Sequence, residues 1–126
     1  MNKYLITGAA LADGTVTDVV IADGVIQSLG ATDAIGLETI NGKGKILLSG
    51  FVDMHTHLRE PGFEQSETVL SGSKAAAKGG FTAVNAMANT SPVADNAAVV
   101  EMVTNLGKEA GYVEVQAIGA VTVGLQ

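Results

Sequence analysis

The chain has 126 residues, of which 47% are apolar, and its formal net charge is −6. This length suffices for one domain with a hydrophobic core, and the acidic balance argues against a nucleic-acid partner, because phosphate binding needs clustered Lys and Arg. Cysteine is absent, which excludes disulfides and thiolate metal ligands. No apolar run reaches the roughly 18 residues of a membrane span, and we expect a cytoplasmic protein.

The first part of the sequence predicts short strands separated by turn residues. Residues 18–22 and 25–29 flank Asp23-Gly24, a dipeptide that favours a two-residue type I′ hairpin turn. Further strands are expected at residues 4–7, 38–40 and 45–48. Because a few short strands bury little surface, we expect a small β-module whose sheet is completed from elsewhere.

From residue 50 onward the pattern changes to strands that alternate with helices. Strands are expected at residues 51–57, 81–87 and 112–118. Because strands joined by helices of this length form βαβ units, the alternation predicts a parallel sheet. In such a sheet, ligands bind beyond the carboxyl ends of the strands.

Two helices are expected between these strands. The first begins after Ser66 as N-cap and ends at Gly79-Gly80, whereas the second begins after Asp95 or Asn96 and ends at Gly111. The side chains expected to face the sheet are Val69, Leu70, Ser73, Ala76 and Ala77 in the first helix, and Val99, Met102, Val103, Leu106 and Ala110 in the second.

The most informative residues are His55 and His57, the only histidines in the chain. They stand two residues apart at the end of an apolar stretch. Because side chains at i and i+2 of a strand point to the same face, the two imidazoles are expected to converge on one cation. Imidazole is a common ligand of zinc. The alternative is a pair of hydrogen-bonded imidazoles at a strand end, without a metal.

Three polar residues near the histidines have two interpretations each. Asp53 either orients a metal ligand or caps the local backbone. Arg59 either pairs its planar guanidinium with a substrate carboxylate or forms a salt bridge with Glu60 or Glu64. Asn89, which follows the second strand, either holds the same carboxylate with its amide or shapes a turn.

Four segments of the sequence resemble the dihydroorotases of the amidohydrolase superfamily. They are Gly50-Phe-Val-Asp-Met-His-Thr-His-Leu-Arg-Glu-Pro-Gly62, Glu67-Thr68, Gly79-Gly-Phe-Thr-Ala-Val84 and Met87-Ala-Asn-Thr-Ser-Pro-Val93. The His-Leu-Arg-Glu-Pro-Gly stretch is a specific signature of that family. Allantoinases commonly have Asn at the position of Arg59, and hydantoinases lack Arg-Glu-Pro-Gly. Ala88 departs from the pattern, since many relatives have Pro there.

The resemblance implies a cyclic amidohydrolase, a dihydroorotase that reversibly cyclises N-carbamoyl-L-aspartate to (S)-dihydroorotate in pyrimidine biosynthesis. It implies that His55 and His57 bind zinc, as one ion or two, and that Arg59 and Asn89 hold the substrate carboxylate. A metal makes hydroxide attack feasible at neutral pH, because it lowers the pKa of water and polarises the ring carbonyl.

The fold that the resemblance implies is α/β. Residues 1–49 would form a composite β-sandwich module, and residues 50–126 the first three strands and two helices of a (β/α)8 TIM barrel. In the family, the general-base aspartate and further metal ligands come from later strands, beyond Gln126. We therefore expect an N-terminal portion of the enzyme that is inactive alone.

Alternative functions remain open. One is another cyclic amidohydrolase, acting on a hydantoin or on allantoin. Another is a non-catalytic module that binds a partner enzyme, for which aspartate carbamoyltransferase is the candidate. The missing strands could also come from a second polypeptide, and we expect homo-oligomeric assembly.

Overall fold

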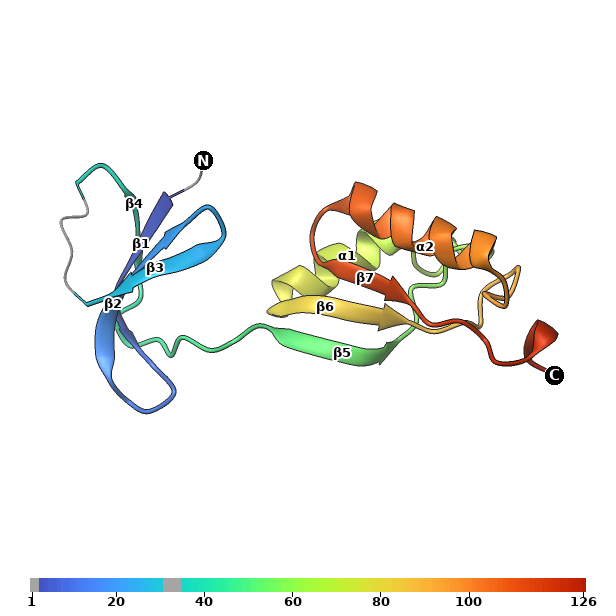
Figure 1. Cartoon of the computed structure of the whole chain (residues 1–126), viewed down its shortest axis with the longest axis horizontal. Helices are drawn as coiled ribbons and strands as arrows, with labels where there is room; N and C mark the ends of the chain where they lie inside the picture. The colour runs from blue at the N-terminus through green and yellow to red at the C-terminus, as the bar shows by residue number, and fades with distance from the viewer. Residues whose placement is uncertain (1–2, 31–34) are drawn as a thin grey trace. The chain divides into compact units, whose positions relative to one another are not determined.

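The computed structural model describes residues 3–30 and 35–126. The chain divides into two compact units, Met1–Ser49 and Gly50–Gln126. The first consists of strands, and the second alternates strands with helices (Figure 1). Within the described ranges, no helix combines the length and the apolar character needed to cross a membrane.

The first unit forms one four-stranded sheet. Its strands are β1 (Lys3–Ala10), β2 (Val16–Ala22), β3 (Val25–Leu29) and β4 (Glu38–Asn41), in the order β3-β2-β1-β4. Strand β4 runs parallel to β1, and the other neighbours are antiparallel. Asp23 and Gly24 both have positive φ, as a type I′ turn requires, so the predicted hairpin between β2 and β3 is confirmed.

The strand predicted at residues 45–48 is wrong. Ile46 forms only an isolated parallel bridge with Ala10. The reason is that Ala10 is the last residue of β1, so the passing segment finds a single residue with which to pair: the backbone N–H of Ala10 donates to Lys45, and that of Leu47 donates to Ala10.

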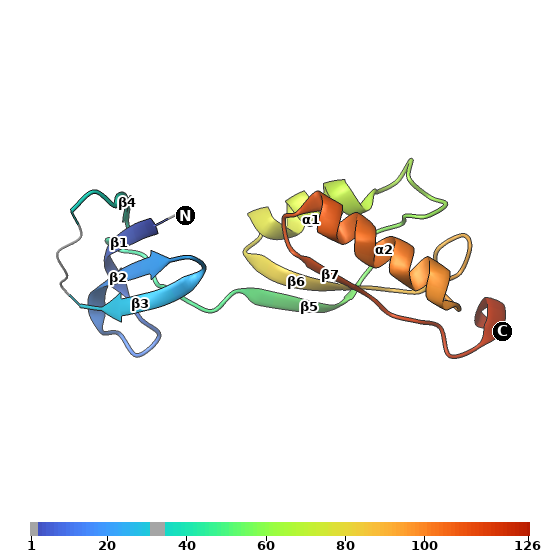
Figure 2. The same cartoon turned by 45° about the horizontal axis from the view of Figure 1, so that its top comes forward.

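The second unit is a parallel sheet covered by two helices. Its strands are β5 (Phe51–Thr56), β6 (Phe81–Ala86) and β7 (Glu114–Ala117), which lie in sequential order. Helices α1 (Val69–Lys78) and α2 (Ala97–Ala110) connect them and lie on the same face of the sheet in both views (Figure 1, Figure 2). This arrangement confirms the predicted α/β alternation, although all three strands are shorter than expected.

The core of this unit lies between the sheet and the helices. Its buried side chains come from both layers: Val69, Val84, Ala86, Val103, Val113 and Val115, joined by Leu58 from the loop after β5. Gly107 allows α2 to approach β7 closely, because a Cβ at this position would lie 2.4 Å from the Cβ of Val115. The small residue therefore sets the distance between helix and sheet.

Both helices end as the sequence predicts, but the first begins two residues late. Its N-cap is Thr68 rather than Ser66, because the Thr68 hydroxyl accepts from the backbone N–H of Ser71 in a capping box. The N-cap of α2 is Asn96, whose side chain accepts from the backbone N–H of Val99. Gly111 then ends α2 in the left-handed conformation.

The prediction of which helix side chains face the sheet is partly wrong. Leu70 and Ala77 of α1 are exposed, as is Met102 of α2. Glycines take part of their place: Gly72 packs against Leu58, where a Cβ would lie 2.6 Å from the leucine Cδ2. A hydrophobic pattern cannot find such contacts, because glycine contributes no apolar side chain.

Ser73 of α1 is fully buried, and its hydroxyl has no hydrogen-bond partner in the part of the chain that the structure describes. Burial of an unpaired hydroxyl costs about 1–3 kcal/mol. We predict that Ser73→Ala raises the free energy of unfolding by about 1 kcal/mol, measured by urea denaturation. Ser71→Ala is the matched control: it removes a capping hydroxyl and should lower stability by a similar amount. A Ser73→Ala variant less stable than the parent would show that the buried hydroxyl is paired.

Candidate metal and substrate site

The two histidines meet at a β-bulge near the carboxyl end of β5. Asp53 pairs with Val84 and Thr56 pairs with Ala86, so three steps along β5 oppose two steps along β6. His55 lies inside this bulge, and His57 follows the last residue of the strand. The strand is therefore irregular at this point, where a bulge can re-aim side chains.

The imidazole rings nevertheless lie close together. Their centroids are 5.2 Å apart, their planes are inclined by 67°, and both residues are exposed. Zn–N distances of about 2.0–2.1 Å and tetrahedral angles place the centroids of two coordinated rings about 5 Å apart. The spacing fits two ligands of one cation.

Two imidazoles do not complete a metal centre. Over residues 3–30 and 35–126, no group of three or more His, Cys, Asp or Glu side chains could hold a metal ion. A structural zinc site has four protein ligands, and a catalytic site has about three. Within the described residues, the two imidazoles therefore match at most part of a zinc site.

Asn89 contacts His57 across the ends of two strands. Its Oδ1 lies 2.9 Å from Nδ1 of His57, although 32 residues separate the two in sequence. The contact is possible because β5 and β6 are parallel, so their carboxyl ends meet at one edge of the sheet. Neither interpretation of Asn89 from the sequence included this contact. It could have been expected from the tendency of metal-binding histidines to form a hydrogen bond through their second ring nitrogen.

The loops that follow β5 and β6 are joined backbone to backbone. The carbonyl of Pro61 accepts from the N–H of Ser91 at 2.9 Å. Gly62 has φ +98° and lies so close that a Cβ there would be 2.2 Å from the Ser91 carbonyl oxygen. The buried Thr90 hydroxyl donates to the Pro92 carbonyl at 2.8 Å. This junction holds the loop bearing Arg59 against the loop bearing Asn89.

The acidic neighbours of Arg59 support the loop. Glu60 Oε2 accepts from the N–H of Val69 at 2.8 Å, which ties the loop to the start of α1. Glu64 Oε1 accepts from the N–H of Gly62 at 2.7 Å, and this hydrogen bond lowers the pKa of the Glu64 carboxyl. Arg59 is half-buried with a left-handed backbone, φ +63°, which non-glycine residues seldom adopt.

Asp53 hydrogen-bonds the local backbone. Its Oδ1 accepts from the N–H of His55 at 2.9 Å, within the bulge. The same carboxylate lines a pocket of about 260 Å³ that also includes His57 and Glu67. By bonding the backbone of a histidine, Asp53 stabilises the irregular strand end that carries the site.

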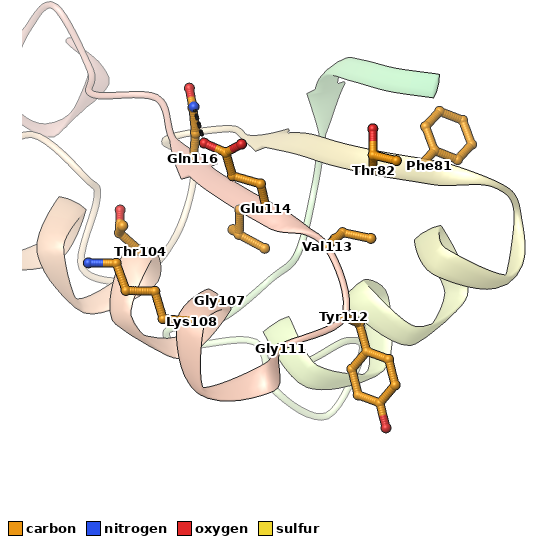
Figure 3. Close-up of a pocket in the computed structure, with 11 residues that line it drawn as sticks. Phe81, Thr82, Thr104, Gly107, Lys108, Gly111, Tyr112, Val113, Glu114 and Gln116 are labelled. Atoms are coloured by element: carbon orange, nitrogen blue, oxygen red, sulfur yellow. Dashed lines mark hydrogen bonds between the residues drawn. The ribbon is translucent and has the colours of Figure 1, made fainter. Parts of the chain in front are cut away.

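A larger pocket, of about 600 Å³, lies along the outer edge of β7 (Figure 3). Thr104 and Lys108 of α2 and Glu114 and Gln116 of β7 contribute to its lining. The amide of Gln116 donates to Glu114 at 2.7 Å. None of the four residues predicted to bind metal or substrate lines this groove, so volume alone does not mark the candidate site.

Comparison with known proteins agrees with the resemblance seen in the sequence. A family model described as "Dihydro-orotase-like" matches residues 44–126. The chain belongs to this dihydroorotase-like family. It is 60% identical to a dihydroorotase from Leifsonia xyli subsp. xyli, covering 99% of this chain and 29% of that protein. A Streptomyces coelicolor dihydroorotase is 58% identical, with coverage of 100% and 30%.

Among solved structures, the L-hydantoinase (dihydropyrimidinase) from Arthrobacter aurescens is similar, with a TM-score of 0.76 and 25% sequence identity. The match covers 94% of this chain and 28% of that protein. The chain thus spans about three tenths of the length of the dihydroorotases it matches. The chain shares its family with the dihydroorotases and its fold with the hydantoinase. Each comparison concerns one part of the longer protein.

We predict that Gly62→Ala disrupts the junction between the two loops. The added methyl group would meet the Ser91 backbone and would also disfavour the positive φ, at a combined cost of about 2 kcal/mol or more. Gly80→Ala is the matched control, because φ is +86° there and a Cβ would make only ordinary contacts with Phe51. Thermal unfolding and the amide NMR shifts of the non-proline residues in 59–63 and 89–91 measure the effect. Equal effects of the two substitutions would show that the junction is not close-packed.

Proposed function

We propose that this chain supplies part of the active site of a zinc-dependent dihydroorotase, which interconverts N-carbamoyl-L-aspartate and (S)-dihydroorotate. The observation that carries the proposal is the convergence of His55 and His57, next to Asn89, at the carboxyl edge of a parallel sheet. Ligands of such sheets bind at this edge. The 60% identity to a dihydroorotase supports the same substrate.

We propose that Gly50–Gln126 corresponds to the first three strands and two helices of a (β/α)8 barrel. The support is topological: the strands are in sequential order and both helices lie on one face (Figure 2). A doubly wound sheet would carry helices on both faces, whereas a barrel has all of them outside. For Met1–Ser49 we propose one sheet of a composite β-sandwich, since the described strands of this unit form a single sheet.

In this proposal His55 and His57 hold zinc through neutral ring nitrogens. When bound, zinc supplies a Lewis acid that polarises an amide carbonyl and lowers the pKa of water toward about 7. Asp53 holds the backbone of His55, and Asn89 holds the ring of His57. The other metal ligands and the general base belong to later strands of the barrel.

Arg59 and Asn89 bind the substrate carboxylate in this proposal. A guanidinium pairs with a carboxylate through two parallel hydrogen bonds, and the Asn89 amide nitrogen can donate a further one. Together they would orient the ring so that its amide carbonyl faces the metal. Hydantoin and allantoin have no carboxylate for this pair, which favours dihydroorotate. The carbamoyltransferase partner, homo-oligomeric assembly and cytoplasmic location stay predictions.

The metal proposal predicts the behaviour of a chimera in which this chain replaces the matching segment of the Leifsonia xyli dihydroorotase. The chimera should contain zinc by elemental analysis and should turn over dihydroorotate in preference to hydantoin or allantoin. His57→Ala should reduce the zinc content and lower kcat/KM by about 1000-fold or more, because the lost metal stabilises the transition state by several kcal/mol. A folded His57→Ala chimera that retains zinc and activity would refute the ligand assignment.

The carboxylate proposal makes a separate prediction in the same chimera. Arg59→Gln should lower kcat/KM for dihydroorotate by about 100-fold, mainly through KM, because charge-assisted hydrogen bonds to the carboxylate are lost. The zinc content should not change. Lys78→Gln, which removes a cation from the exposed end of α1, is the control and should have no effect. Unchanged KM in Arg59→Gln would assign the carboxylate to another residue.

A further inference from the structure

We infer that Asn89 is a positioning residue for His57: its side-chain oxygen accepts the Nδ1 hydrogen of the imidazole and thereby leaves Nε2 as the nitrogen that faces a metal. The metal half of this inference rests on the proposed function. The hydrogen bond itself does not, because it exists between two side chains of this chain.

The orientation of the Asn89 amide determines which ring nitrogen of His57 carries the hydrogen. Oδ1 of Asn89 lies 2.9 Å from Nδ1 of His57. An amide oxygen can only accept, and a neutral imidazole carries one N–H. With Oδ1 facing Nδ1, the hydrogen lies on Nδ1, which leaves the lone pair on Nε2. Histidines that bind metals typically bond a carbonyl or carboxylate through the other nitrogen in this way.

The backbone around Asn89 holds the acceptor in place. Just before it, the N–H of Met87 donates to the carbonyl of Thr56 at 2.9 Å, and this joins the chain beside Asn89 to the residue that precedes His57. The carbonyl of Ala88 accepts from the N–H groups of Thr90 and Ala94 at 2.9 and 3.0 Å. Asn89 is thus flanked by fixed backbone on both sides, although its own side chain is exposed.

The same hydrogen bond determines which end of the amide is free. The opposite amide orientation would instead let the NH₂ group donate to Nδ1 and would place the imidazole hydrogen on Nε2. The structure has Oδ1 at Nδ1. The free end is therefore the NH₂ group, a donor of two hydrogens. The orientation of His57 and the donor offered to an anionic substrate are consequently set by one residue.

The tautomer can be measured directly in this chain without metal. Two-dimensional ¹⁵N–¹H NMR of the imidazoles, at a pH at which they are neutral, distinguishes Nδ1–H from Nε2–H. We expect His57 to be in the Nδ1–H form and to shift toward the Nε2–H form in Asn89→Leu, with His55 unchanged as an internal control. Asn89→Asp retains an acceptor and should keep the Nδ1–H form. A wild-type His57 with the hydrogen on Nε2 would overturn the inference, and this measurement needs no variant.

Zinc affinity separates positioning from a purely structural role. In the chimera, with zinc as the only ligand, Asn89→Leu should weaken binding by about 10–100-fold, whereas Asn89→Asp should not weaken it. Asn89→Asp should still raise KM for dihydroorotate, because a carboxylate replaces the donor. Equal losses of zinc affinity in the two variants, or none in Asn89→Leu, would overturn the inference. If the tautomer is as expected but the chimera binds no zinc, the proposed function fails while the hydrogen bond stands.

Discussion

The pairing of β5 with β6 is the constraint on which the candidate site depends. The two strands are parallel, and the hydrogen bond from Met87 to Thr56 extends their pairing past the end of β6. Parallel pairing brings both carboxyl ends to one edge, so the two following loops start side by side. The Pro61–Ser91 hydrogen bond and the close approach at Gly62 then join these loops. Without this pairing, nothing in the local sequence would bring His57 and Asn89 into contact.

Much of the fold could be predicted because its signals are local. Asp23-Gly24 specifies a hairpin turn through backbone conformation alone, and Asn96 and Gly111 mark the two ends of a helix by capping. The alternation of strands and helices also placed the histidines at the correct edge of the sheet. Their rings lie close together, as the sequence predicts, where the pairing of β5 with β6 is irregular.

The features that could not be predicted depend on tertiary contacts. Gly72 and Gly107 are buried because a neighbouring side chain occupies the space of a Cβ, and a hydrophobic pattern assigns glycine no inward preference. It therefore placed Leu70 and Met102 inward instead. The hydrogen bond between His57 and Asn89 is similar, because 32 residues separate its partners and only the register of the sheet relates them.

The polar groups of the site divide into those that shape the loop and those that remain for ligands. Asp53, Glu60 and Glu64 each accept a backbone N–H hydrogen bond, so these carboxylates stabilise the chain around the histidines. The imidazoles are neutral ligands and add no negative charge. Each of the three carboxylates uses one oxygen in this way. In the same way, the Asn89 oxygen contacts His57, and its amide nitrogen is the group left to donate.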